Sequence, residues 1–327
     1  YMSALENGLQ PNSLIPDAPF VVDQGSELGK WKPENYGKQF YGPSTLRKGV
    51  ENSRNLMTIR IAQYLGMEKV SEIAKRSGVM ENMPNVLSMA LGAGETSLID
   101  LTAAYASFIN GGKKIEPSLI DRIQDRRGKN IFLENFASCT NCEEPYIEEN
   151  PMPKLVNSSE SIFDEAKSYQ MVSILKGAVD RGTGRKTKID GIEIAGKTGT
   201  TNNNTDAWFI GFTSDLIIGV YAGFDKPKSL GKRETGSSVA VPIFRDFVKN
   251  YYQEKPILPF TIPNGIELIK INYDTGEIAS NFNSSESVYE AFSKSDNLVS
   301  SGEILVGSEG FQIIEVADEV MEEYVIY

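Results

Sequence analysis

The sequence predicts an α/β protein in which a mainly antiparallel sheet is flanked by helices and accompanied by a helical subdomain. Early segments repeat apolar residues at three- and four-residue spacing, which is typical of helices. Later segments alternate or are rich in β-branched and aromatic residues, which is typical of strands. The 327 residues, 40% of them hydrophobic, suffice for one large domain or two of ordinary size.

The helical segments come first along the chain. Residues 44–76 place apolar side chains at helical spacing around a break at Gly66. A second stretch, 98–109, ends at Asn110-Gly-Gly112, a typical helix stop. Residues 161–179 form the third predicted helix, with one apolar face.

The spacing of apolar residues then changes to that of strands. Ile192-Glu-Ile194 alternates, 208–212 is aromatic and β-branched, and 216–224 is a third candidate strand. A hairpin-like turn at 213–215 joins the last two. A short helix is predicted after Pro242.

Composition divides the rest of the chain. Residues 120–158 mix charged, strand-like pieces with a segment rich in Cys and Pro, and are predicted to be exposed. We assign residues 1–255 to the main domain and 256–327 to an acidic C-terminal extension with a turn near 274–276. No segment reads as a membrane helix or signal peptide. Because the chain starts at Tyr1, we expect it to be a piece of a longer polypeptide, with any anchor or export signal upstream.

Charge and residue usage exclude several functions. The formal net charge of −11 disfavours binding to nucleic acid. The sequence contains no histidine, which rules out Ser-His-Asp and Cys-His mechanisms and imidazole metal sites. In a hydrolase or acyltransferase of this composition, lysine must serve as the base.

The two cysteines, Cys139 and Cys142, lie close together in the exposed segment. Two thiolates without histidine cannot complete a four-ligand zinc site, so no metal site is predicted. A redox-active pair needs a lowered thiol pKa, whereas Glu143 and Glu144 would raise it. We interpret the pair as a short surface disulfide, which favours an extracytoplasmic location.

Two incompatible motifs share Lys197. Gly191–Thr198 fits the phosphate-loop pattern G-x-x-x-x-G-K-[ST], whereas Lys197-Thr-Gly199 is typical of serine enzymes that act on cell-wall peptides and β-lactams. A phosphate loop needs a permissive interior and a following helix. Here Glu193 would repel phosphate, and residues 198–204 are poor helix formers. A strand carrying Lys197, beside a cleft that suits a carboxylate, fits better.

Several motifs in order resemble the transpeptidase domain of the large, bifunctional (class A) penicillin-binding proteins. The resemblance runs from Tyr1 to about Val248 and more faintly to about Phe292. It includes the second family motif, Ser-x-Asn, at Ser53-Arg-Asn55. The other matching segments are Phe40-Tyr-Gly-Pro43, Leu91-Gly-Ala-Gly94, Ala104-Tyr-Ala106, Asn110-Gly-Gly112, Gly182-Thr-Gly184, Ala195–Asn202 and Asp206–Phe212.

The first family motif, Ser-x-x-Lys, supplies the nucleophile and its base. In the family it normally precedes a segment like Tyr1–Gly8, so here its position falls before residue 1. Two other matches occur, Ser173-Ile-Leu-Lys176 inside the third helix and Ser229-Leu-Gly-Lys232 in a polar loop. We interpret both as accidental.

The resemblance implies a penicillin-binding protein/β-lactamase-like fold and a serine D,D-transpeptidase without a cofactor. Residues 1–255 would then be a transpeptidase domain lacking its N-terminal part. By carry-over, Ser53 would relay a proton, Asn55 would hold the nucleophile's lysine, and Lys197 would poise Ser53. Substrate binding would fall to Thr198, Gly199, Thr200 and Thr201. A plain structural role, with Ser53 and Asn55 capping a helix, is the alternative for these side chains.

The implied partners are peptidoglycan stem peptides and β-lactams, at the periplasmic face of the inner membrane. A membrane anchor and a glycosyltransferase domain are expected upstream, and other cell-wall synthesis proteins as partners. Two alternatives remain: a non-catalytic fragment that binds a carboxylate or β-lactam, because the nucleophile motif is missing, and a serine β-lactamase. The 327-residue chain on its own is expected to be inactive.

Overall fold

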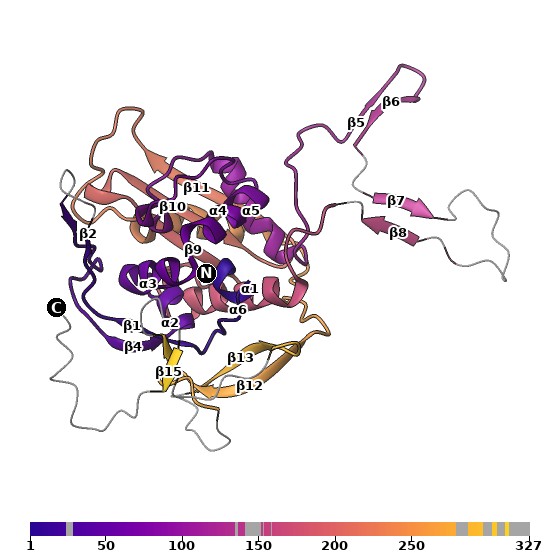
Figure 1. Ribbon diagram of the computed structural model, residues 1–327. Coiled ribbons are helices and arrows are strands. Elements are labelled where there is room, and N and C mark those ends of the chain that lie inside the picture. The colour runs from indigo at the N-terminus through magenta and orange to yellow at the C-terminus, as the bar shows by residue number, and fades with distance from the viewer. Residues whose placement is uncertain are drawn as a thin grey trace.

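Helices and mostly antiparallel strands form the body of the protein in the computed structural model (Figure 1). The predicted α/β class is confirmed. Within the described part of the chain, no helix is both long and apolar enough to cross a membrane. The structure describes residues 1–23, 29–134, 137–140, 152, 154–157, 159–278, 287–296, 303–305 and 311–313.

The predicted helical segments are all present. The break at Gly66 is confirmed, since this residue has a φ of +84° and separates two helices. The third predicted helix begins at Glu165 rather than Ser161, because the Asp164 side chain caps it by accepting from the Lys167 amide. The α helices are α1 (Met2–Glu6), α2 (Leu46–Glu51), α3 (Asn55–Leu65), α4 (Met67–Arg76), α5 (Leu98–Ile109), α6 (Glu165–Asp180) and α7 (Val241–Tyr251).

Strands β9 (Ala195–Thr200), β10 (Asp206–Phe212) and β11 (Ile217–Gly223) form an antiparallel sheet in the order β11-β10-β9. The prediction of a strand at Ile192–Ile194 is wrong. Ile192 forms an isolated bridge with Ile189 across a tight turn at 190–191, residues 193–194 belong to no regular element, and the strand starts only at Ala195.

The remaining strands form small sheets around this body. Hairpin β5–β6 is exposed throughout and projects from the body in Figure 1, as predicted for residues 120–158. The other strands are β1 (Leu14–Asp17), β2 (Val22–Asp23), β3 (Lys30–Trp31), β4 (Gly42–Thr45), β5 (Arg122–Gln124), β6 (Asn130–Leu133), β7 (Ala137–Thr140), β8 (Lys154–Asn157), β12 (Ile266–Asn272), β13 (Ser287–Ser293), β14 (Glu303–Leu305) and β15 (Phe311–Ile313).

Helix α6 is the central element of the packing. It contacts β9 on one side, α2 and α5 on others, and β13 of the C-terminal hairpin. Most of its residues are buried, including Ile174, Leu175 and Ala178. The helix therefore connects the sheet that carries Lys197 with the helix that precedes Ser53.

Segments beyond residue 255 pack onto this body. Hairpin β12–β13 buries Ala291 and Phe292, and β14 pairs in parallel with β1 through Leu14 and Ile304. The predicted turn at 274–276 closes the end of β12. The division into residues 1–255 and 256–327 stays a prediction.

Candidate active site

Lys197 and Ser53 meet although they are 144 positions apart in the sequence. The Lys197 ammonium donates to the Ser53 hydroxyl oxygen at 2.8 Å and to the Thr198 carbonyl at 3.0 Å. Ser53 lies in the turn between α2 and α3, with a φ of +54°. A non-glycine residue in this left-handed region is strained, and such strain persists where the surroundings fix the backbone, often at functional sites. The arrangement presents an exposed hydroxyl to the tip of a lysine.

Asn55 is the first residue of α3. Its side-chain amide donates to the Glu34 carbonyl at 2.9 Å, and within the described residues it is not bonded to Ser53 or Lys197. The alternative in which Ser53 and Asn55 cap a helix is not supported, because the N-cap of α3 is Arg54 and no side chain caps that end. Of the predicted catalytic residues, the structure joins Ser53 to Lys197 and leaves Asn55 beside them.

The threonines after Lys197 have separate partners. The Thr198 hydroxyl donates to that of Thr183 at 2.8 Å, and the Thr200 hydroxyl accepts from the Gly236 amide at 3.0 Å. Thr198 and Thr200 lie on the same face of β9 because strand residues alternate. Thr201 lies one residue beyond β9, and its hydroxyl bonds to the Asp206 carboxylate at 2.9 Å.

Gly199 lies where strands β9 and β10 approach each other closely. It faces Trp208 of β10, and a Cβ on Gly199 would stand 3.1 Å from the Trp208 Cβ. Thr183 is a site residue that sequence reasoning missed. Its signal was the Gly-Thr-Gly sequence between α6 and the sheet, which was recognised only as a family segment.

Burial makes the ammonium of Lys197 give up its proton more readily than that of an ordinary lysine. Removal from water disfavours the ammonium and lowers the pKa of Lys197 from 10.5 to about 8. A lysine with such a pKa can release and regain a proton near neutral pH. Among the described strands, β9 forms one edge of its sheet, so its backbone can bond an extended peptide.

The other chemistry considered for the sequence finds no site here. Strand β9 and a short 3₁₀ turn at Asn202–Asn204 follow Gly191, so the helix that a phosphate loop requires is absent from this stretch. Within the described ranges, no three His, Cys, Asp or Glu side chains gather to hold a metal ion. Cys142 lies outside the described residues, as does the side chain of Cys139, so the disulfide stays a prediction.

The Ser-x-x-Lys match inside α6 has structural partners. The Ser173 hydroxyl accepts from the Arg47 guanidinium at 2.9 Å, whereas the Lys176 ammonium pairs with Glu193 at 3.1 Å. The two side chains therefore serve different contacts. Ser229 and Lys232 lie in a loop, as predicted.

Comparison with known families identifies the domain. The model of the penicillin binding protein transpeptidase domain matches residues 1–249. The chain belongs to the penicillin-binding protein transpeptidase family. The resemblance to the class A members is thereby confirmed, with relatives named penicillin-binding protein 1A.

Relatives and solved structures of penicillin-binding proteins cover most of this chain. Penicillin-binding protein 1A of Rickettsia bellii is 43% identical over 304 residues, which are 91% of this chain and 38% of that protein. Its counterpart from Pseudomonas aeruginosa is 33% identical over 341 residues, 94% of this chain and 41% of that protein. The crystal structure of penicillin-binding protein 1A from Haemophilus influenzae matches with a TM-score of 0.78 and 29% identity, over 92% of this chain and 47% of that one. This transpeptidase domain thus spans about two fifths of the length of its curated relatives.

The lowered pKa of Lys197 gives a testable pH dependence in this transpeptidase domain. Unfolded lysine keeps its proton to about pH 10.4, whereas folded Lys197 loses it near pH 8. Between these values the unfolded chain binds more protons, so the contribution of Lys197 to stability rises with pH. We expect the native chain to gain stability relative to Lys197→Met between pH 7 and 10, measured by urea unfolding. A difference that stays constant over this range would contradict the expectation.

Proposed function

We propose that the chain is the catalytic transpeptidase part of a longer, class A penicillin-binding protein that cross-links peptidoglycan stem peptides. The observation that carries the proposal is the 2.8 Å hydrogen bond from Lys197 to Ser53. It joins the Ser-x-Asn turn to the Lys-Thr-Gly strand. These are the second and the third of the three motifs that serine enzymes of this kind use. The first, Ser-x-x-Lys, would lie before Tyr1, and we refer to a polypeptide that includes it as the longer polypeptide.

The proposed reaction is acyl transfer through a serine ester. The Ser-x-x-Lys serine attacks the carbonyl between the two terminal D-alanines and loses its proton to its lysine. The terminal D-alanine leaves as an amine after gaining a proton. An amine of a second stem peptide then attacks the ester, forms the cross-link and frees the serine.

Each predicted site residue has a part in this reaction. Ser53, poised by Lys197, relays the proton to the leaving amine, and Asn55 holds the nucleophile's lysine and the substrate amide. Asn55 can do this while it keeps its bond to the Glu34 carbonyl, because its side-chain oxygen can accept from the lysine ammonium and its second amide hydrogen can donate to the substrate.

Substrate binding is assigned to the strand that carries Lys197. Thr198 and Thr200 bind the terminal carboxylate, while Gly199 and Thr201 line the backbone path of the peptide. The Thr200 amide is one oxyanion donor, an interaction worth on the order of 3 kcal/mol in enzymes where such a donor was removed.

The proposed setting follows from the family. The longer polypeptide is expected to be anchored at the periplasmic face of the inner membrane and to act with other cell-wall synthesis proteins. A glycosyltransferase domain in the remaining length is part of the proposal, as are stem peptides and β-lactams as ligands. The β-lactamase alternative is not favoured, because the relatives are penicillin-binding proteins.

Labelling with a fluorescent penicillin tests the proposal. We expect the longer polypeptide to form a stable covalent adduct. The 327-residue chain should form none, because the ester needs the Ser-x-x-Lys serine. Stem-peptide dimers should form when the longer polypeptide is given a pentapeptide donor and an amine acceptor. Labelling of the 327-residue chain would locate a nucleophile within it. Rapid turnover of nitrocefin by the longer polypeptide would favour a β-lactamase.

A further inference from the structure

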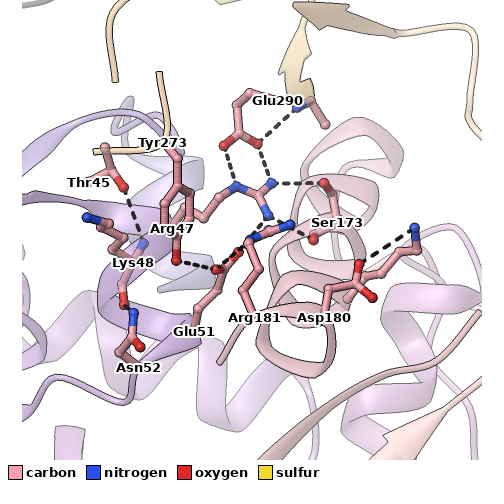
Figure 2. Close-up of polar contacts among 12 residues, drawn as sticks. Thr45, Arg47, Lys48, Glu51, Asn52, Ser173, Asp180, Arg181, Tyr273 and Glu290 are labelled. Carbon is pink, nitrogen blue, oxygen red and sulfur yellow. Dashed lines mark hydrogen bonds and ion pairs between the residues drawn. The ribbon is translucent and has the colours of Figure 1, made fainter. Parts of the chain in front are cut away.

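A buried cluster of charged side chains joins the C-terminal hairpin to α2 (Figure 2). The guanidinium of Arg47 in α2 makes a two-pronged ion pair with the carboxylate of Glu290 in β13, and the two residues are 243 positions apart. Arg47 also donates to the Ser173 carbonyl of α6 at 3.0 Å. The side chains of Arg47 and Glu290 are 3% and 0% exposed. A pair so deeply buried must be fully bonded to persist.

Glu51 is the second acid of this cluster. Its carboxylate accepts from Arg47 at 3.1 Å, from Arg181 at 2.6 Å and from the Tyr273 hydroxyl at 2.7 Å. Two arginines and two glutamates leave the cluster with no net formal charge. Burial alone would lower the pKa of Arg47, but the ion pairs with Glu290 and Glu51 outweigh it and raise that pKa.

Room for Glu51 is made by a glycine inside α6. A Cβ on Gly177 would stand 1.8 Å from a carboxylate oxygen of Glu51, so no larger residue fits without moving it. Glycine destabilises a helix interior by about 1 kcal/mol relative to alanine. Its presence in the last turn of α6 is therefore explained by the Glu51 carboxylate.

The backbone of Glu51 touches both parts of the candidate active site. Its carbonyl accepts from the Thr183 amide at 3.0 Å, and the Thr183 hydroxyl accepts from Thr198 at 2.8 Å. Ser53 follows Glu51 by two residues, in the strained turn. A Cβ on Gly182 would lie 2.0 Å from the Glu51 carbonyl oxygen, so this contact between segments is as close as the backbone allows.

Resting on the proposed function, we infer that Glu51 is a positioning residue of the active site and that Glu290 holds it in place through Arg47. The carboxylate of Glu51 fixes the end of α2, and its carbonyl fixes Thr183 against the Lys197 strand. Hairpin β12–β13 lies beyond the residues that the family model matches, 1–249, and yet it supplies the anchor. The hairpin thus helps to position the active site through Glu290.

A second ion pair between the same elements provides a matched control. Lys48 of α2 pairs with Asp274 of the turn that follows β12, where the Asp274 side chain is 69% exposed. Exposed pairs contribute little because water solvates both charges. Asp274→Asn therefore removes a link between α2 and the hairpin without leaving a buried charge.

The acylation rate constant of the longer polypeptide tests the inference. We compare Glu51→Gln, Glu290→Gln and Asp274→Asn by stopped-flow with a fluorescent penicillin, at a temperature where circular dichroism shows each variant folded. Small misplacements of catalytic groups lower rates by about tenfold to a hundredfold, and we expect this loss for Glu51→Gln and Glu290→Gln. For Asp274→Asn we expect a change of at most about twofold, as for a surface pair. A folded Glu290→Gln variant that acylates at the native rate would overturn the inference.

Two further measurements cover the other outcomes. Gly182→Ala should reduce the acylation rate in the same way, because its Cβ forces Thr183 away from Glu51 without removing a charge. If the native longer polypeptide does not acylate at all, the proposed function fails. Hydrogen exchange of the Thr183 amide in the 327-residue chain then tests the inference. We expect faster exchange in Glu290→Gln than in the native chain, and an unchanged exchange rate would contradict the inference.

Discussion

Replacing Lys197 with methionine is expected to lower the acylation rate of the longer polypeptide by about 10²–10⁴-fold, the range over which acid–base groups contribute. The ammonium of Lys197 donates to Ser53 at 2.8 Å, and its pKa is lowered to about 8. Methionine keeps much of the side-chain volume but can neither poise Ser53 nor attract a carboxylate. The measurement is the rate of labelling by a fluorescent penicillin, with the folded fraction checked by circular dichroism.

Lys176→Met is the control for this substitution. Lys176 of α6 pairs with Glu193, which precedes β9, and belongs to the Ser-x-x-Lys match that we interpret as accidental. Its variant should label at the native rate, and a comparable loss would mean that the match in α6 is functional. Lys197→Arg adds a distinction, since it retains the charge for a carboxylate but cannot release its proton.

Replacing Arg47 with methionine is expected to destabilise the chain by about 3–5 kcal/mol, the effect of removing one partner from a buried ion pair. Glu290 and Glu51 would keep their carboxylates in the interior, with only Arg181 left as a counter-charge. Urea titration of the 327-residue chain at neutral pH gives the free energy of unfolding, which measures this loss.

The same measurement on Lys48→Met supplies the comparison. Lys48 lies one residue further along α2 and pairs with the exposed Asp274, so we expect a loss of no more than about 1 kcal/mol. Equal losses in the two variants would show that the burial of the Arg47 cluster does not set its stability. Adding Glu290→Met to Arg47→Met should restore part of the loss, because an apolar pair leaves no unpaired charge.

The parts of the fold that local patterns determine could be predicted from the sequence. Helices α5 and α6 follow from apolar spacing and from end signals such as Asn110-Gly-Gly112, and the pairing of β10 with β11 follows from two apolar runs around a short turn. The Lys197 strand could be chosen over a phosphate loop because the residues after it disfavour a helix. The alternation of Ile192 and Ile194 predicts too early a start for this strand, since Ile192 ends a tight turn and Ile194 directly precedes β9.

Contacts over long sequence separations could not be predicted in the same way. Thr183 bonds to Thr198, and Glu290 pairs with Arg47, only because α6 and the hairpin pack together in three dimensions. A glutamate in an acidic stretch reads as a solvated charge, since most glutamates are exposed. Glu290 lies within the apolar run Val288–Phe292, which favours a strand, but nothing in the local sequence identifies Arg47 as its partner.

The Arg47–Glu290 pair also constrains the order in which the domain can mature during synthesis. Arg47 leaves the ribosome 243 residues before its partner, and the parallel pairing of β1 with β14 also forms late, although β1 can pair earlier with β4. Until Glu290 emerges, Arg47 has an acid in Glu51 but lacks the carboxylate that bonds its Nε and one of its terminal nitrogens. Because domains generally fold as units, we expect the packing of α2 to be completed only after Glu290 has emerged. A nascent longer polypeptide halted before residue 290 is expected to hold the Ser53 turn without this anchor and to react with β-lactams more slowly than the complete chain.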